Sequence, residues 1–279
     1  MRPPLLLPLF GALTLPLLGE APVPPVVLGF AVTGSATLGT QYIFRGLTQT
    51  DGQPMVQAEL DLAHGAGWYV SLAGSNISWF TDQNANTAAH PVSLGSPGPL
   101  GAKSNSAGTE VDVFGGYKWG FAKDWTLDLG LCRYLYPGTY GNLGAFRNPH
   151  TTEAYMGLTY SWASLKVSRV ISACAFGVSA SQGTTYVDLS LAIPLGESGW
   201  TALAHGGRTS YAGSGNTLLT YSDYKVGLAK ELRGYTFALA ATNAGTKARA
   251  ADNDTPVYEN ALGRNIGKGR VTFTLTKSF

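Results

Sequence analysis

Apolar and polar side chains alternate one by one in many short segments of this chain. The clearest run sets Val187, Leu189, Leu191 and Ile193 against Tyr186, Asp188 and Ser190. Successive side chains of a β-strand point to opposite faces, so a period of two residues predicts a strand with one apolar and one polar face. The period never changes to the 3.6 residues of a helix, and the chain is therefore predicted to be all-β.

Twelve segments carry this alternation, and the last of them places Val271, Phe273 and Leu275 against threonines before the chain reaches Phe279. In the segment at 200–209, the pattern does not show which side chains form the apolar face and which form the polar face. The predicted strands lie near 30–42, 56–62, 68–73, 110–113, 125–131, 153–159, 164–171, 186–193, 200–209, 223–228, 235–240 and 270–276.

The connections between these segments alternate between short and long. Short ones lie at 64–67, 119–124, 160–164, 194–199 and 230–234, and long polar ones at 44–54, 80–107, 136–150, 173–183, 210–217 and 243–268. Outer-membrane barrels distribute periplasmic turns and extracellular loops in this way, whereas a Greek-key sandwich does not. The expected fold is a transmembrane antiparallel up-and-down β-barrel of about 12 strands.

Aromatic residues agree with a membrane setting, because tryptophan concentrates at lipid–water interfaces. Five tryptophans lie at or beside the short turns: Trp68, Trp119, Trp125, Trp162 and Trp200. Arg169 is the exception to the pattern, because its place in the alternation puts a charged side chain on the lipid-facing side of its strand. Either a β-bulge changes the register there or the side chain extends to the headgroups.

The amino terminus predicts export. Met1 and Arg2 precede an apolar stretch from Leu5 to Leu18, and residues 1–21 are interpreted as a signal peptide with cleavage near Ala21. Residues 22–279 then form a single barrel domain. Charged residues make up only 13% of the chain and its net charge is +2, without the basic run of a nucleic-acid-binding protein. We expect the outer membrane of a Gram-negative bacterium, with lipid, lipopolysaccharide and the barrel-assembly machinery as partners.

The stretch from 32 to 80, with YIFRGLTQTDGQPMVQAELDLAH and GWYVSLAGSNISWF, resembles the TorF family of proteobacterial porin-like outer-membrane proteins. The resemblance continues through EVDVFGGYKW, YLYPG and TTYVDLSLAIPL and covers nearly all of the mature chain. Its most specific piece is the loop motif of Arg45, Gly46, Thr48, Gln49 and Asp51. The resemblance implies a channel role without a substrate. A strand ending on an aromatic residue also resembles the last strand of such barrels, which implies that Phe279 is an assembly signal.

If the apolar faces contact lipid, charged side chains line the lumen. The predicted pore-lining residues are Glu59, Asp61, Glu110, Asp112, Asp128, Glu153, Lys166, Asp188, Asp223 and Lys225, and Lys118 and Arg270 share their parity. A water-filled lumen with this acidic excess would weakly prefer cations and pass small polar solutes or ions. In the alternative interpretation, these charges pair across strands and fill a narrow interior.

The loop motif also allows two interpretations. Arg45 either points into the barrel mouth to hold carboxylates or phosphates, or acts as a structural clamp on a glycine-containing loop, which we favour. Asp252 and Asp254 lack the spacing of a calcium loop, so neither a metal nor a cofactor is predicted. Cys132 and Cys174 have no local motif and are expected to be unpaired.

Two other functions remain open from sequence. One is a closed structural or surface-recognition barrel that acts through its extracellular loops, and the other is a lipase-like enzyme. The chain has neither a GxSxG nor an HExxH motif. His64 falls at a periplasmic turn and His90 and His150 in outer loops, so only His205 is placed to serve as a base. We therefore predict that the protein is not an enzyme.

Overall fold

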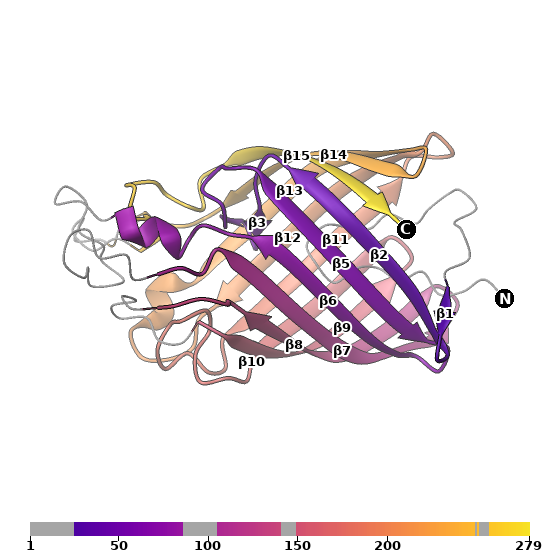
Figure 1. Ribbon diagram of the computed structural model, residues 1–279, viewed down its shortest axis with the longest axis horizontal. Helices are drawn as coiled ribbons and strands as arrows, with labels where there is room; N and C mark the ends of the chain where they lie inside the picture. Colours follow the sequence, from indigo (N-terminus) through magenta and orange to yellow (C-terminus); the bar gives the residue numbers. More distant parts are fainter. Residues whose placement is uncertain (1–24, 86–104, 141–148, 249, 251–256) are drawn as a thin grey trace.

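The computed structural model describes residues 25–85, 105–140, 149–248, 250 and 257–279, and its strands form a closed antiparallel barrel (Figure 1). Strand β2 (Phe30–Gly39) closes the barrel, because it pairs with β5 (Met55–His64) on one side and with β15 (Arg270–Ser278) on the other. Twelve strands make the closed wall, and short β1 (Val26–Val27) adds to β2. The predicted all-β barrel is confirmed.

The remaining strands of the wall pair with their neighbours in chain order. They are β6 (Trp68–Asn76), β7 (Thr109–Ala122), β8 (Trp125–Leu135), β9 (Thr151–Tyr160), β10 (Ala163–Val170), β11 (Thr185–Pro194), β12 (Trp200–Ser210), β13 (Tyr221–Leu232) and β14 (Tyr235–Ala244). Because every strand of a closed sheet has two neighbours, no edge is left with unpaired backbone groups, which is what a hydrocarbon environment requires.

The alternation of side chains makes the outer surface of the barrel apolar and its inner surface polar. On β13, Tyr224, Val226 and Leu228 are 59%, 61% and 47% exposed, whereas the intervening Asp223 is 1% exposed. An apolar surface that continues around a whole barrel matches lipid and would be a liability in water. In the described residues, the helical segments are too short to cross a membrane.

Short turns and long connections gather at opposite ends of the barrel (Figure 1). The carboxyl terminus and β1 lie at the short-turn end, and the five tryptophans of the predicted girdle are all exposed. Arg169 is the second-last residue of β10, and the pairings of β10 run without a register shift. The bulge interpretation is therefore wrong, and Arg169 lies at the long-loop end of its strand.

The carboxyl terminus completes the seam between β15 and β2. The backbone N–H of Phe279 donates to the Gly34 carbonyl at 3.0 Å, and the Gly34 N–H donates to the Phe279 carbonyl at 2.9 Å. A Cβ on Gly34 would lie 2.7 Å from Cε2 of Phe279, so the aromatic ring packs closely against this glycine. The final residue thus contributes both hydrogen bonds and packing to barrel closure.

Candidate functional site: the barrel lumen and its mouth

The connection between β2 and β5 folds inward instead of forming an outer loop. Its hairpin pairs β3 (Ile43–Phe44) with β4 (Leu47–Thr48), and the turn residues Arg45 and Gly46 have φ values of 47° and 78°. A Cβ on Gly46 would lie 2.5 Å from Cβ of Asp223 on β13, so the tip packs directly against the barrel wall. The first predicted strand ends at Gly39 rather than near residue 42.

Tyr42 falls within the predicted first strand at 30–42, but it belongs to this inward-folded segment and is only 5% exposed. Its hydroxyl donates a hydrogen bond to Glu110 Oε1 on β7 at 2.7 Å. The segment therefore touches β7 through Tyr42 and β13 through Gly46, which lie on separate parts of the barrel wall. The hairpin crosses the lumen between them.

Arg45 fixes the tip of the hairpin to a third part of the wall. Its Nη1 and Nη2 donate to the two carboxylate oxygens of Glu153 on β9 at 2.9 and 2.7 Å, and the two side chains are only 8% and 2% exposed. The guanidinium also lies 4.8 Å from the ring centroid of Phe44 and 4.3 Å from that of Tyr186. The bidentate partner of Arg45 is thus a carboxylate of the protein itself, which is the geometry of a clamp.

The other residues of the loop motif stabilise the same hairpin. Thr48 Oγ1 accepts a hydrogen bond from the Gly52 N–H at 3.3 Å, and Gln49 Nε2 donates to the Leu47 carbonyl at 3.1 Å. Asp51 accepts from Arg264 in the β14–β15 connection at 2.8 Å. The motif therefore joins the hairpin to itself and to a neighbouring loop.

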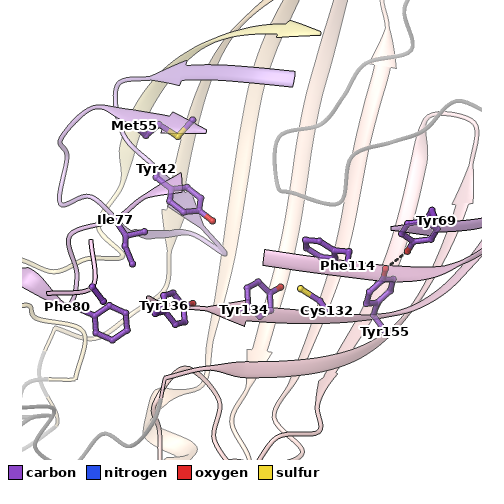
Figure 2. Close-up of a cluster of buried hydrophobic side chains, with 11 residues drawn as sticks. Tyr42, Met55, Tyr69, Ile77, Phe80, Phe114, Cys132, Tyr134, Tyr136 and Tyr155 are labelled. Carbon is purple, nitrogen blue, oxygen red and sulfur yellow. Dashed lines mark hydrogen bonds between the residues drawn. The ribbon is translucent and has the colours of Figure 1, made fainter. Parts of the chain in front are cut away.

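A polar network lies inside the lumen on the other side of the hairpin. The Tyr69 hydroxyl donates to Asp128 at 2.8 Å and shares a second hydrogen bond with the Tyr155 hydroxyl, drawn as a dashed line in Figure 2. These contacts connect β6, β8 and β9, so they pass through the barrel interior. Lys118 lies 4.6 Å from the ring centroid of Tyr69, and Lys166 lies 4.0 Å from that of Tyr155.

Figure 2 shows a row of buried side chains on the inner side of the wall, with Phe114, Cys132 and Tyr134 between Tyr155 and Tyr136. Cys132 is free and buried on this inner face, and Cys174 is also free.

His205 forms a second polar cluster on β11 to β13. Its Nε2 lies 2.8 Å from Asp223 Oδ1, and its Nδ1 lies 3.1 Å from Ser190 Oγ and 3.3 Å from Asp188 Oδ2. The Ser190 hydroxyl donates to Asp188 at 2.7 Å. His205 therefore faces the lumen.

All ten predicted pore-lining residues lie on the inner side of the barrel. They divide into three groups rather than forming one ring. Glu110, Asp112 and Glu153 lie beside the hairpin, Glu59, Asp61, Asp128 and Lys166 lie near the tyrosine network, and Asp188, Asp223 and Lys225 surround His205. Lys118 and Arg270 also face inward.

The hairpin forms the floor of a cavity of about 170 Å³ at the long-loop end of the barrel. Its wall is rich in aromatic rings, which come from six different connections and from the first residue of β13. They are Phe44, Trp79, Tyr136, Phe176, Tyr211, Tyr221 and Tyr258. We call this cavity the vestibule.

Several polar atoms of vestibule residues have no hydrogen-bond partner within the described part of the chain. They are Trp79 Nε1, Gln83 Oε1, Asp51 Oδ1 and Asn260 Nδ2. Burial raises the pKa of Asp82 in this wall, and the nearby Asp51 carboxylate raises it further. Sequence reasoning missed the vestibule because its residues are dispersed over loops without a periodic pattern.

Several predictions fall on residues outside the described ranges. They concern the signal peptide at 1–21, His90, and the aspartates Asp252 and Asp254. Among the residues that are described, no group of three His, Cys, Asp or Glu side chains is arranged to hold a metal ion.

The closed wall, apolar exterior and polar interior define a transmembrane antiparallel β-barrel. The chain belongs to the family Gcw_chp, described as a bacterial protein of unknown function, whose family model matches residues 27–279. No curated protein matches the chain in sequence.

Three solved structures illustrate what the chain is similar to. A NanC porin is 9% identical, with 87% of this chain and 97% of that chain covered and a TM-score of 0.48. A KdgM porin in complex with disordered oligogalacturonate is 7% identical, with 88% and 99% covered and a TM-score of 0.48. Outer membrane phospholipase A from Escherichia coli is 13% identical, with 88% and 92% covered and a TM-score of 0.41.

Proposed function

We propose that the protein is a channel in the outer membrane of a Gram-negative bacterium, through which small polar solutes or ions diffuse passively. The observation that carries this proposal is a closed barrel with an apolar exterior and ionisable side chains along its inner wall. Such an interior is polar enough to hold water and to stabilise a charged or hydrogen-bonding solute. The resemblance of residues 32 to 80 to TorF-family porins supports the same role.

The hairpin gives this channel a constriction near its outer mouth. Arg45 and Gly46 lie across the lumen between β9 and β13, so a solute must pass beside them or displace them. The clamp between Arg45 and Glu153 would keep the channel narrow in its resting state. Release of the tip from Glu153 would widen it.

The charge of the inner wall favours cations weakly. Eight carboxylates face the lumen, against the four basic residues Lys118, Lys166, Lys225 and Arg270 and the hairpin residue Arg45. The carboxylates thus exceed these five positive charges by three before His205 is counted. A net negative lining in a confined space attracts cations and repels anions.

The vestibule would select the solute before it reaches the constriction. Aromatic faces pack against the apolar surface of a small molecule, while unpaired donors and acceptors match hydroxyl or amide groups. Its mixture of donor atoms (Trp79, Asn260) and acceptor atoms (Gln83, Asp51) favours solutes that can both donate and accept. Small uncharged polar molecules and cations fit this lining better than anions.

Planar-bilayer recording of the purified protein tests the channel. We expect stepwise currents with a reversal potential displaced toward cations in a salt gradient. Heat-unfolded protein at the same concentration provides the control. Absence of current steps from correctly folded, heat-modifiable protein would remove the channel proposal.

A closed barrel that recognises ligands at its surface is a second candidate, because the hairpin spans the lumen and the vestibule opens at the loop end. This function would give no current steps in either the wild type or a variant that releases the hairpin. It would still allow ligand binding in the vestibule. We propose no catalytic activity. This proposal would be contradicted if the wild type hydrolysed a lipid or ester substrate and His205→Ala did not.

A further inference from the structure

We propose that the outer face of β8 to β12 binds the phosphate groups of lipopolysaccharide through a row of three arginines: Arg133, Arg169 and Arg208. The row lies on the lipid-facing side, outside the lumen described above. The inference rests on the proposed outer-membrane location but not on channel activity.

The three arginines share one position on three alternate strands. Each has the outward parity of its strand and lies within the last three residues at the long-loop end of β8, β10 or β12. The other outward residues of β8 to β12 are uncharged, with Leu129, Leu131, Met156, Leu165 and Leu189 among them. The arginines are therefore the only charged side chains on this face.

The strand register shows that the row is regular. Arg133 pairs with Thr152 of β9 and Arg169 with Ala154, an offset of two residues. Across β11, Arg169 pairs with Thr185 and Arg208 with Val187, again an offset of two residues. Each step therefore moves two strands sideways and two residues along a strand.

This step fits a row that runs level around a tilted barrel. Two strands correspond to about 10 Å sideways and two residues to about 7 Å along the strand, which places neighbouring arginine Cα atoms about 12 Å apart. The slope of that step is about 35°, within the tilt expected for strands of outer-membrane barrels. Three cations at one membrane height can contact several phosphates together.

The distance from the tryptophan girdle places the row at the outer boundary of the hydrocarbon. Arg133 is eight residues beyond Trp125, and Arg208 is eight residues beyond Trp200. Eight residues span about 27 Å along a strand and about 22 Å across the membrane at this tilt, close to the height of the apolar band, about 25 Å. The guanidinium groups thus reach the level of the outer headgroups.

The contacts of the arginines leave donors free for a ligand. Arg133 Nη1 donates to Thr152 Oγ1 at 2.5 Å, and Arg208 Nη1 donates to Ser222 Oγ at 3.1 Å. Within the described residues, no carboxylate forms an ion pair with any of the three arginines. A planar guanidinium with free N–H groups binds phosphate in bidentate fashion, and lipopolysaccharide supplies phosphates at this level.

Native mass spectrometry of the protein in detergent with added purified lipopolysaccharide tests the proposal. We expect Arg133→Ala/Arg169→Ala/Arg208→Ala to bind lipopolysaccharide at least about tenfold more weakly than the wild type. A matched pair of double variants removes two outward positive charges each. Arg169→Ala/Arg208→Ala should lose affinity, whereas Lys230→Ala/Lys277→Ala, at the girdle end, should retain it.

Two further measurements separate the explanations. Dephosphorylated lipopolysaccharide should bind the wild type as weakly as intact lipopolysaccharide binds the triple variant. In bilayers without lipopolysaccharide, the wild type and the triple variant should have the same conductance. Absence of current in both would count against the channel proposal without affecting the lipopolysaccharide result. The assignment would be overturned if the wild type and the triple variant bound lipopolysaccharide equally well, or if the wild type bound intact and dephosphorylated lipopolysaccharide equally well. Heat-modifiability establishes that each variant is folded.

Discussion

Replacing Arg45 with alanine removes the side chain that holds the hairpin tip against the barrel wall. Glu153, which is 2% exposed in the intact pair, would then keep the Tyr134 hydroxyl at 3.5 Å as a hydrogen-bond partner among the described residues. Removal of one member of a buried ion pair costs about 3–5 kcal/mol, because the other charge is left without compensation. The inserted position of the hairpin should lose free energy of this order.

That loss changes the balance between inserted and released hairpin by about two to four orders of magnitude, since about 1.4 kcal/mol corresponds to a factor of ten. Single-channel recording measures the change directly. We expect Arg45→Ala to show larger conductance steps or a higher open fraction than the wild type. The double variant Arg45→Ala/Glu153→Ala should recover part of the loss of stability, because neither buried charge then remains.

Arg264→Ala provides the matched control. Arg264 also bridges to this hairpin, through Asp51, but its side chain is 58% exposed, and exposed pairs contribute only about 0–1 kcal/mol. Its conductance should stay close to that of the wild type. Wild-type current steps and an unchanged unfolding midpoint in Arg45→Ala would refute the clamp, as would equal effects of the two substitutions.

Gly46→Val should displace the hairpin and raise conductance, as Arg45→Ala should, because the backbone at Gly46 is left-handed and a Cβ there would clash with Asp223. Gly65→Val, where nothing lies within 4 Å of the added Cβ, should have little effect. Equal current traces for the two variants would contradict this packing. Deletion of Phe279 should reduce the fraction of heat-modifiable barrel in the outer membrane, and a normal fraction would count against its role in closure. Lys166→Glu should move the reversal potential toward cations, and an unchanged potential would place this side chain off the ion path.

The barrel could be predicted from sequence because alternation, turn lengths and tryptophan positions are local signals that repeat along the chain. The inward hairpin could not, since each of its strands has only two residues and leaves no periodic signal. Its position is decided by Glu153, which is 108 residues from Arg45. The loop motif was recognised, but its partner on the wall was not.

The arginine row illustrates a second limit. Only Arg169 was noticed, because the segment at 200–209 mixes alanine and glycine on its outward face and conceals the parity of Arg208. Arg133 lay beyond the predicted end of its strand, which the structure extends to Leu135. Register between strands, which aligns the three side chains, depends on pairing that no single segment encodes.

The seam between β2 and β15 also determines how the chain must fold. All other wall strands pair with a neighbour in sequence, but Thr37 and Thr276 meet across 239 positions. Bringing such distant segments together costs about 5 kcal/mol of chain entropy before any contact offsets it. Because pairing of β2 with β15 is the one non-local step in this topology, we expect it to set the kinetic barrier to folding. Substitutions along this seam should therefore slow formation of the closed barrel more than substitutions in any hairpin.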